Sequence, residues 1–141
     1  MADVIYNSFK SKIMDGSIDL DTDTIKVALV TSSYTPNQDS HEDYADLTNE
    51  CSGAGYTAGG ATLANKAVTT DDTDNEGVFD ADNVTWSSST IASARGAVVY
   101  KDSGVDATSW LICYLDLGAD YSSVAGDFTL TWDAEGIVNL A

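Results

Sequence analysis

The sequence is organised around its longest nearly unbroken apolar run, Trp110-Leu111-Ile112-Cys113-Tyr114-Leu115-Asp116-Leu117, which Gly118 closes. A run of eight residues, rich in aromatic and branched side chains and bounded by turn residues, predicts a strand that is buried on both faces. Side chains alternate along a strand. The expected faces are Leu111, Cys113, Leu115 and Leu117 against Trp110, Ile112 and Tyr114. We therefore place this strand at the centre of a sheet.

Two further apolar segments flank this strand at short distances along the chain. Residues 94–101 precede it, and their apolar character is strongest at 97–100. After it, Phe128, Leu130 and Trp132 alternate with polar residues, which is typical of a half-buried strand. Because the connections are short, we predict a C-terminal meander of these three segments.

The remainder of the chain adds more strands and little helix. Apolar alternation predicts strands at residues 25–30, 62–70, 78–86 and 91–101, and a short edge strand at 137–140. About seven strands without helical crossovers favour a mainly β fold, an antiparallel β-sandwich or a jelly-roll-like barrel. At 141 residues, the simplest organisation is one domain over residues 1–141.

One amphipathic helix is predicted at the N-terminus, over residues 3–14. Ile5, Phe9 and Ile13 recur every four residues and form an apolar stripe. The stripe is expected to cover the sheet that follows, and docking onto another subunit is the alternative. Ile5, Phe9 and Ile13 are therefore the candidate interface residues.

Charge and hydropathy restrict the partners. The chain carries 23 acidic and 6 basic residues, a net charge of -17, and its lysines are scattered. Binding of nucleic acid requires clustered cations, so no nucleic-acid partner is expected. No apolar run approaches the roughly 18 residues of a membrane helix, and the N-terminus lacks a signal-peptide pattern. We expect a protein made in a cytoplasm, without a membrane partner.

No catalytic constellation emerges from the sequence. His41 is the single histidine and lies in a long polar segment, where an ordinary loop residue is expected. The glycines of residues 53–60 form neither a Gly-x-Ser-x-Gly elbow nor a phosphate-binding loop. Close pairs such as Asp80 and Asp82 arise readily in so acidic a chain. We therefore predict no enzyme, no catalytic residue and no cofactor.

Two acidic stretches are similar to calcium loops but depart from the pattern. Asp19-x-Asp21-x-Asp23 is followed by Thr24 where glycine is needed, and Val30 stands at the glutamate position. Asp72-x-Asp74-x-Glu76 keeps Gly77, yet Asn83 replaces the glutamate. No metal site is predicted. A weak cation site at residues 71–76 is the alternative to a solvated hairpin turn.

The cysteines and tryptophans are interpreted mainly as core residues. Cys113 is expected to be buried, whereas Cys51, in a glycine-rich neighbourhood, is expected to be more accessible; a bridge between them remains open. Trp86, Trp110 and Trp132 are expected to anchor the core, and exposed aromatic residues that bind carbohydrate are the alternative.

Several motifs spread along nearly the whole chain are similar to those of one known family. The first lie at residues 5–10 and in Asp19-Leu20-Asp21-Thr22-Asp23-Thr24-Ile25-Lys26-Val27-Ala28-Leu29-Val30-Thr31. The middle motifs are Gly55-Tyr56-Thr57-Ala58-Gly59-Gly60-Ala61-Thr62-Leu63 and Val84-Thr85-Trp86-Ser87-Ser88-Ser89-Thr90-Ile91. The C-terminal motifs are Ala94-Arg95-Gly96-Ala97-Val98-Val99-Tyr100 and Gly126-Asp127-Phe128-Thr129-Leu130-Thr131-Trp132. Together these motifs resemble those of virion structural proteins of tailed bacteriophages.

The resemblance implies a non-enzymatic virion component, and it transfers no catalytic residue. An outer capsid decoration or head-fibre protein is the leading expectation. A neck or tail subunit, such as a collar, tube-associated or adaptor protein, is the alternative within the family, and a carbohydrate-binding adsorption module is the alternative of another class. The expected partners are other virion proteins, the major capsid protein or neck and tail proteins, together with further copies of this chain, because repetition in a particle imposes symmetry.

Overall fold

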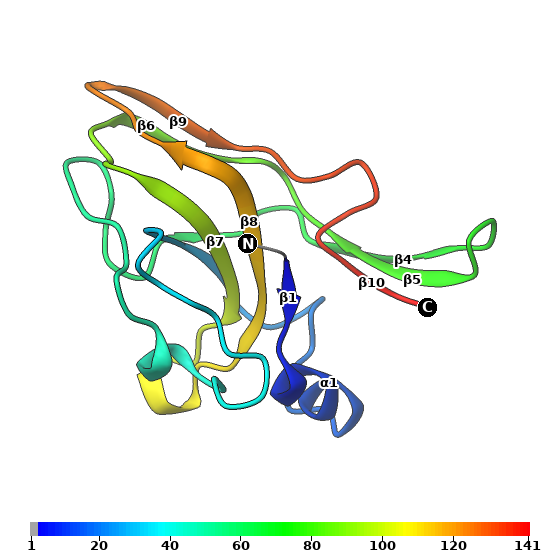
Figure 1. The fold of residues 1–141 in the computed structure, drawn as a ribbon. Coiled ribbons are helices and arrows are strands. Elements are labelled where there is room, and N and C mark those ends of the chain that lie inside the picture. Colours follow the sequence, from blue (N-terminus) through cyan, green and yellow to red (C-terminus); the bar gives the residue numbers. More distant parts are fainter. Residues whose placement is uncertain (1–2) are drawn as a thin grey trace.

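The computed structural model describes residues 3–141, and these form a mainly β fold with one short N-terminal helix (Figure 1). The strands lie in antiparallel sheets that do not close into a barrel within the described chain. This confirms the predicted class. No helix in residues 3–141 is both long and apolar enough to cross a membrane.

The largest sheet has five strands in the order β1-β8-β7-β2-β3. Its members are β1 (Val4–Ile5), β8 (Leu111–Tyr121), β7 (Ala94–Lys101), β2 (Ile25–Val30) and β3 (Ala61–Thr62). β7 occupies the centre, and all its residues except Arg95 and Lys101 are buried. β8 was expected at the centre but lies next to the edge, because only the two-residue β1 covers its outer side.

A bulge near the start of β8 changes the predicted faces. Val99 pairs with Cys113, but the next residue, Tyr100, pairs with Leu111, so β8 holds one extra residue, Ile112. Ile112 and Cys113 consequently pack into the same core, and Leu111 lies on the opposite side with Tyr114. Relative to Cys113, the predicted faces are therefore wrong for Trp110, Leu111 and Ile112 and right from Cys113 to Leu117.

The predicted C-terminal meander is correct for β7 and β8 only. β9 (Gly126–Leu130) pairs with β6 (Val84–Ser89) in a separate two-stranded sheet. The strand predicted at residues 78–86 is also two strands, since β5 (Glu76–Asp80) and β6 belong to different sheets. The chain turns between them at residues 81–83, where the Asn83 side chain accepts a hydrogen bond from the Trp132 N–H (3.1 Å).

A third sheet projects from the body as a hairpin (Figure 1). It contains β4 (Ala67–Asp71), β5 and β10 (Val138–Leu140) in the order β10-β5-β4. The short C-terminal edge strand is thereby confirmed. Phe79 and Val138 of this sheet pack into the main core, whereas four residues of β4, Ala67 to Thr70, are exposed.

The two faces of the five-stranded sheet are covered differently. One face packs against the other sheets and α1 through aliphatic and aromatic side chains. The other face carries a cluster centred on Tyr6, Tyr34, Tyr100 and Tyr114, and the loops between β2 and β3 cover it. These loops contain the 3-10 helix η1 (Tyr44–Asp46), and η2 (Asp106–Thr108) lies between β7 and β8.

Glu50 fixes the glycine-rich loop beside this second face. Its carboxylate accepts hydrogen bonds from the Tyr56 hydroxyl (2.6 Å) and the Gly59 N–H (2.7 Å), and also from the Tyr44 hydroxyl. The Gly60 backbone lies against β2, because a Cβ built on Gly60 would stand 1.8 Å from the Val27 carbonyl oxygen. The absence of a side chain at Gly60 therefore permits the close approach of this loop to β2.

The N-terminal helix is shorter than predicted. α1 spans Asn7–Met14, and Val4–Ile5 form β1 instead. The chain pairs with β8 up to Tyr6, whose N–H donates to the Ile112 carbonyl (3.2 Å), so the helix begins only after this pairing ends.

Candidate functional site

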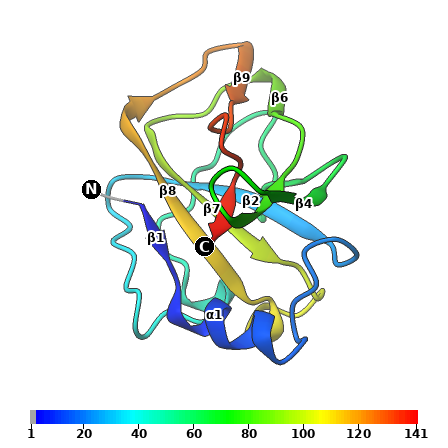
Figure 2. The same ribbon diagram turned by 90° about the vertical axis from the view of Figure 1, so that its right-hand side faces the viewer.

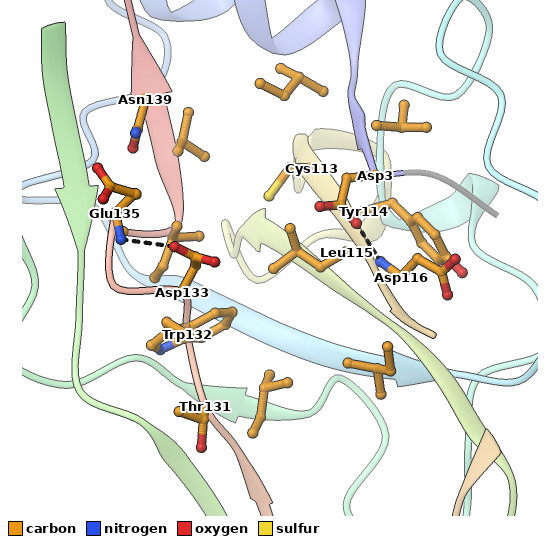
Figure 3. A pocket seen from close by; sticks show the side chains of 17 residues that line it. Asp3, Cys113, Tyr114, Leu115, Asp116, Thr131, Trp132, Asp133, Glu135 and Asn139 are labelled. Atoms are coloured by element: carbon orange, nitrogen blue, oxygen red, sulfur yellow. Dashed lines mark hydrogen bonds between the residues drawn. The ribbon is translucent and has the colours of Figure 1, made fainter. Parts of the chain in front are cut away.

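A cleft of about 660 Å³ opens on one side of the molecule. It lies between the β1–β8 edge and the segment that runs from the end of β9 through β10 (Figure 3). Figure 2 views the molecule from this side, with β8 and β1 on the left and the C-terminal strand in the middle. The cleft forms because β9 leaves β8 to pair with β6, so no strand fills the space between β8 and β10.

The floor of the cleft is apolar. Leu115 and Leu117 project from β8 toward the main core but remain only half-buried. Opposite them, Trp132 is buried, and its indole N–H donates to the Asp82 carbonyl (2.9 Å). The Trp132 backbone N–H also donates, to the Asn83 side chain. Together the two hydrogen bonds hold Trp132 in place beside the floor. A ligand that covers this apolar floor removes it from water, and this burial would stabilise the complex.

Carboxylates surround this floor. Asp3 accepts a hydrogen bond from the Asp116 N–H (2.7 Å), and Asp133 accepts one from the Glu135 N–H (2.9 Å), as Figure 3 shows. Asp116 also pairs with Arg95 (2.8 Å), whose guanidinium holds the pKa of this carboxyl well below its usual range. Glu135 is exposed. Backbone N–H groups therefore hold the carboxylates of Asp3 and Asp133, and the Arg95 guanidinium holds that of Asp116.

A second depression of about 430 Å³ continues the cleft toward the far end of β9. The two share Leu117, Leu130 and Thr131, so they form one groove, which we call the β8–β9 groove. Asp127 adds a further carboxylate, and Tyr121, half exposed, adds an aromatic wall. Among the described residues, no lysine, arginine or histidine lines either part of the groove.

The candidate interface residues do not lie together. Ile5 lines the cleft from β1, Phe9 is completely buried in the main core, and Ile13 borders a separate depression beside Val68. Phe9 thus has no surface to offer a partner. The expectation that the helix covers the sheet accounts for Phe9, whereas an interface at Ile5 and Ile13 stays a prediction.

The acidic stretch at residues 71–76 forms the turn between β4 and β5. Carboxylate oxygens of Asp71, Asp74, Glu76 and Glu135 lie within 4.8 Å of one another. Asp71, rather than the predicted Asp72, belongs to this group, and its carboxylate caps the turn by accepting from the Thr73 N–H (2.8 Å). The turn accounts for three of these four carboxylates, and Glu135 approaches them from the segment between β9 and β10, so a weak cation site here stays a prediction.

His41 and Cys51 lie outside the groove, whereas the buried Cys113 is among the residues that line it. His41 Nδ1 is 2.9 Å from the Tyr34 hydroxyl and accepts a hydrogen bond from the Asn37 N–H (3.2 Å). Because a backbone N–H can only donate, this contact requires an unprotonated Nδ1. Cys113 is buried as predicted, but Cys51 is buried as well, which corrects the expectation of greater access. Burial raises the pKa of the Cys51 thiol to about 11 and that of Cys113 to about 12.

Apart from Ile5, no residue of the groove was predicted from the sequence as part of a binding site. The relevant signal is the acidic turn Asp133-Ala134-Glu135-Gly136 directly after Trp132, which joins an aromatic anchor to two carboxylates. The pattern is local, but its opposite wall, Asp3 and residues 113–117, comes from distant parts of the chain.

Comparisons with protein-family models, with curated proteins and with solved structures gave no match to this chain.

Proposed function

We propose that this chain is a non-enzymatic structural component of a tailed-bacteriophage virion, specifically an outer capsid decoration or head-fibre protein. It would be made in the host cytoplasm and incorporated into the particle, where it would bind other virion proteins and further copies of itself. The proposal combines the sequence resemblance with the character of the groove.

The motifs that carry the resemblance coincide with the structural framework. Residues 25–30 form β2, residues 94–100 lie in β7, and residues 126–130 form β9. Residues 55–63 contain the loop that Glu50 holds against β2. The resemblance therefore concerns the residues that set the fold, which is what relatives with different surfaces would retain.

The observation that carries the proposal is the β8–β9 groove, an apolar floor between fixed carboxylates. Asp3, Asp116 and Asp133 accept hydrogen bonds from backbone or guanidinium donors, so their oxygens are committed to positioning the chain. The pKa of Asp116 is lowered, whereas a general acid at neutral pH needs a raised one. Such a site suits the docking of a neighbouring subunit better than bond-making chemistry.

The charge favours the outside of the particle. A net charge of -17 is repelled by packaged DNA and keeps many closely spaced copies soluble before assembly. The same charge is compatible with a neck or tail position, which remains the alternative within the family.

The tryptophans give little support to a carbohydrate-binding module. Trp86 and Trp132 are buried, and Trp110 is partly buried with the Lys12 ammonium 4.2 Å from its ring centroid. A glycan array tests this alternative directly, since binding that disappears on Trp110→Ala would favour it.

Copy number tests the proposal and separates its alternatives. Quantitative mass spectrometry of purified particles is expected to give hundreds of copies for a shell decoration, and a dozen or fewer for a neck or tail subunit. Particles without this chain, or turnover of a polysaccharide by the purified protein, would contradict the proposal.

A further inference from the structure

We propose that the β8–β9 groove binds an extended, basic and partly apolar segment of a neighbouring virion polypeptide, which adds to the open edge of β9 as a strand. This inference rests on the proposed function for the identity of the partner, but the binding mode follows from the groove itself. Three features carry it: open strand edges, the half-buried floor, and the charge.

The groove is bordered by strand edges rather than by strand faces. Five consecutive residues at and after β9, residues 127–131, line one end, and five consecutive residues of β8, residues 113–117, line the other. A strand that presented one face would contribute alternate residues only. Consecutive lining residues therefore indicate that the backbone of each strand faces the groove.

In the part of the chain that the structure describes, the β9 edge at the groove has no strand partner, and the β8 edge has only the two-residue β1. β9 pairs with β6 alone, and no residue of β6 lines the groove, so the groove lies on the unpaired side of β9. β1 covers β8 only at Cys113 and Tyr114. An unpaired edge offers backbone N–H and C=O groups to an extended segment, which is the basis of recognition by strand addition.

The floor selects apolar side chains on such a segment. Leu115 and Leu117 belong to the main core, yet they are only half-buried because no strand lies between β8 and β9. Alternate side chains of an added strand would point onto these leucines and Trp132. The partner segment thereby completes a core that the chain alone leaves open.

The charge selects basic side chains at the remaining positions. The groove is lined by Asp3, Asp127, Asp133 and Glu135, together with Asp116, whose charge is balanced by Arg95. A segment with lysine or arginine gains attraction there, whereas an acidic segment is repelled. A second copy of this chain is a poor occupant, because its lysines are dispersed and its net charge is -17.

Binding to an array of random decapeptides tests the inference with the purified chain and does not require the particle. Bound peptides are expected to be enriched in lysine or arginine and in branched apolar residues. The variant Asp133→Asn/Glu135→Gln should weaken binding of the best peptide at least about tenfold. The matched control Glu42→Gln/Asp106→Asn changes the same charges on residues outside the groove and should bind as the parent does.

Backbone methylation of the best peptide tests strand addition specifically. In a strand added to β9, only alternate backbone amides of the peptide face β9. N-methyl groups on that set of residues should therefore abolish binding, and N-methyl groups on the other set should leave binding unchanged. Equal effects of both sets would overturn strand addition.

Three other outcomes of the peptide-binding experiments would contradict the inference. Absence of binding, acidic or neutral selected peptides, or equal weakening by the groove and control variants would each overturn the inference. Particles that contain this chain would still uphold the proposed function in that case, whereas peptide binding by a chain that particles lack would uphold the groove and refute the virion role.

Discussion

The two faces of the five-stranded sheet are covered by different elements, and their side chains differ accordingly. The face covered by loops carries tyrosines whose hydroxyls bond to the loops, such as Tyr100 to the Gly59 carbonyl (2.5 Å) and Tyr6 to Tyr34 (2.8 Å). The face covered by sheets is apolar, and it stays open where β9 departs from β8. Loops need hydrogen-bonding side chains to close a core because their backbone groups lack regular partners. The closed face therefore serves stability, and the open face is available to a partner.

The largest expected effect is a charge placed in the apolar core. Cys113→Asp should lower the free energy of unfolding by at least about 4 kcal/mol, because the site is buried and offers no cation to pair with the carboxylate. Denaturant unfolding measures it. Tyr121→Asp, at the exposed end of the same strand, should change stability by less than about 0.5 kcal/mol. A Cys113→Asp variant as stable as the parent would mean that the apolar face is not a core.

Alkaline pH should destabilise the protein through its buried thiols. The thiol pKa is raised to about 11 at Cys51 and about 12 at Cys113, from an ordinary value of 9.0. A group whose pKa is raised on folding contributes stability that is present below the ordinary pKa and is lost as pH rises toward the folded value. Stability should therefore fall above about pH 9, by up to about 1.4 kcal/mol per pH unit for each thiol.

Thiol substitution checks the origin of this loss. Removal of both thiols by Cys51→Ala/Cys113→Ala should flatten the decline, and the residual slope would come from the buried tyrosines, whose pKa values burial also raises. An unchanged slope in the double variant would show that the thiols do not contribute.

A matched pair of tyrosines tests the role of hydroxyl bonds on the loop-covered face. Tyr100→Phe leaves the Gly59 carbonyl without this donor and should cost about 1 to 2 kcal/mol. Tyr114 lies in the same cluster, but its buried hydroxyl has no hydrogen-bond partner among the described residues. Tyr114→Phe should therefore be neutral or stabilising by up to about 1 kcal/mol. Equal losses in both variants would contradict the assignment of stability to the hydroxyl bond.

The smallest stability effect is expected in the groove. Asp133→Asn/Glu135→Gln retains the turn, because the amide oxygen that replaces the Asp133 carboxylate can still accept a hydrogen bond from the backbone N–H of residue 135. The double substitution should alter the free energy of unfolding by less than about 0.5 kcal/mol. Its effect should instead appear in partner binding. Loss of folding in this variant would show that the two groove carboxylates are required for the fold.

The sequence was sufficient for the fold class and for strands with regular alternation. β2 matches the prediction, and so do residues 97–100 of β7, because side chains alternate there between the two faces of the sheet. The predictions were wrong where non-local pairing overrides local pattern. The Ile112 bulge is set by the register with β7, and β9 pairs with β6, which precedes both β7 and β8 in the chain. The groove arises from the same choice of partner, so only the wall at residues 132–136 had a local pattern, and its pairing with residues 113–117 could not be read from the sequence.

A reconstruction of the purified particle, at a resolution that resolves strands, tests whether this chain is a virion protein that binds its neighbour through the β8–β9 groove. We expect this fold on the outer surface of the shell, with the β8–β9 groove turned toward a neighbouring polypeptide and an extended segment against β9. Particles with no density for this chain, or with the chain present and the groove open to solvent in every copy, would contradict it.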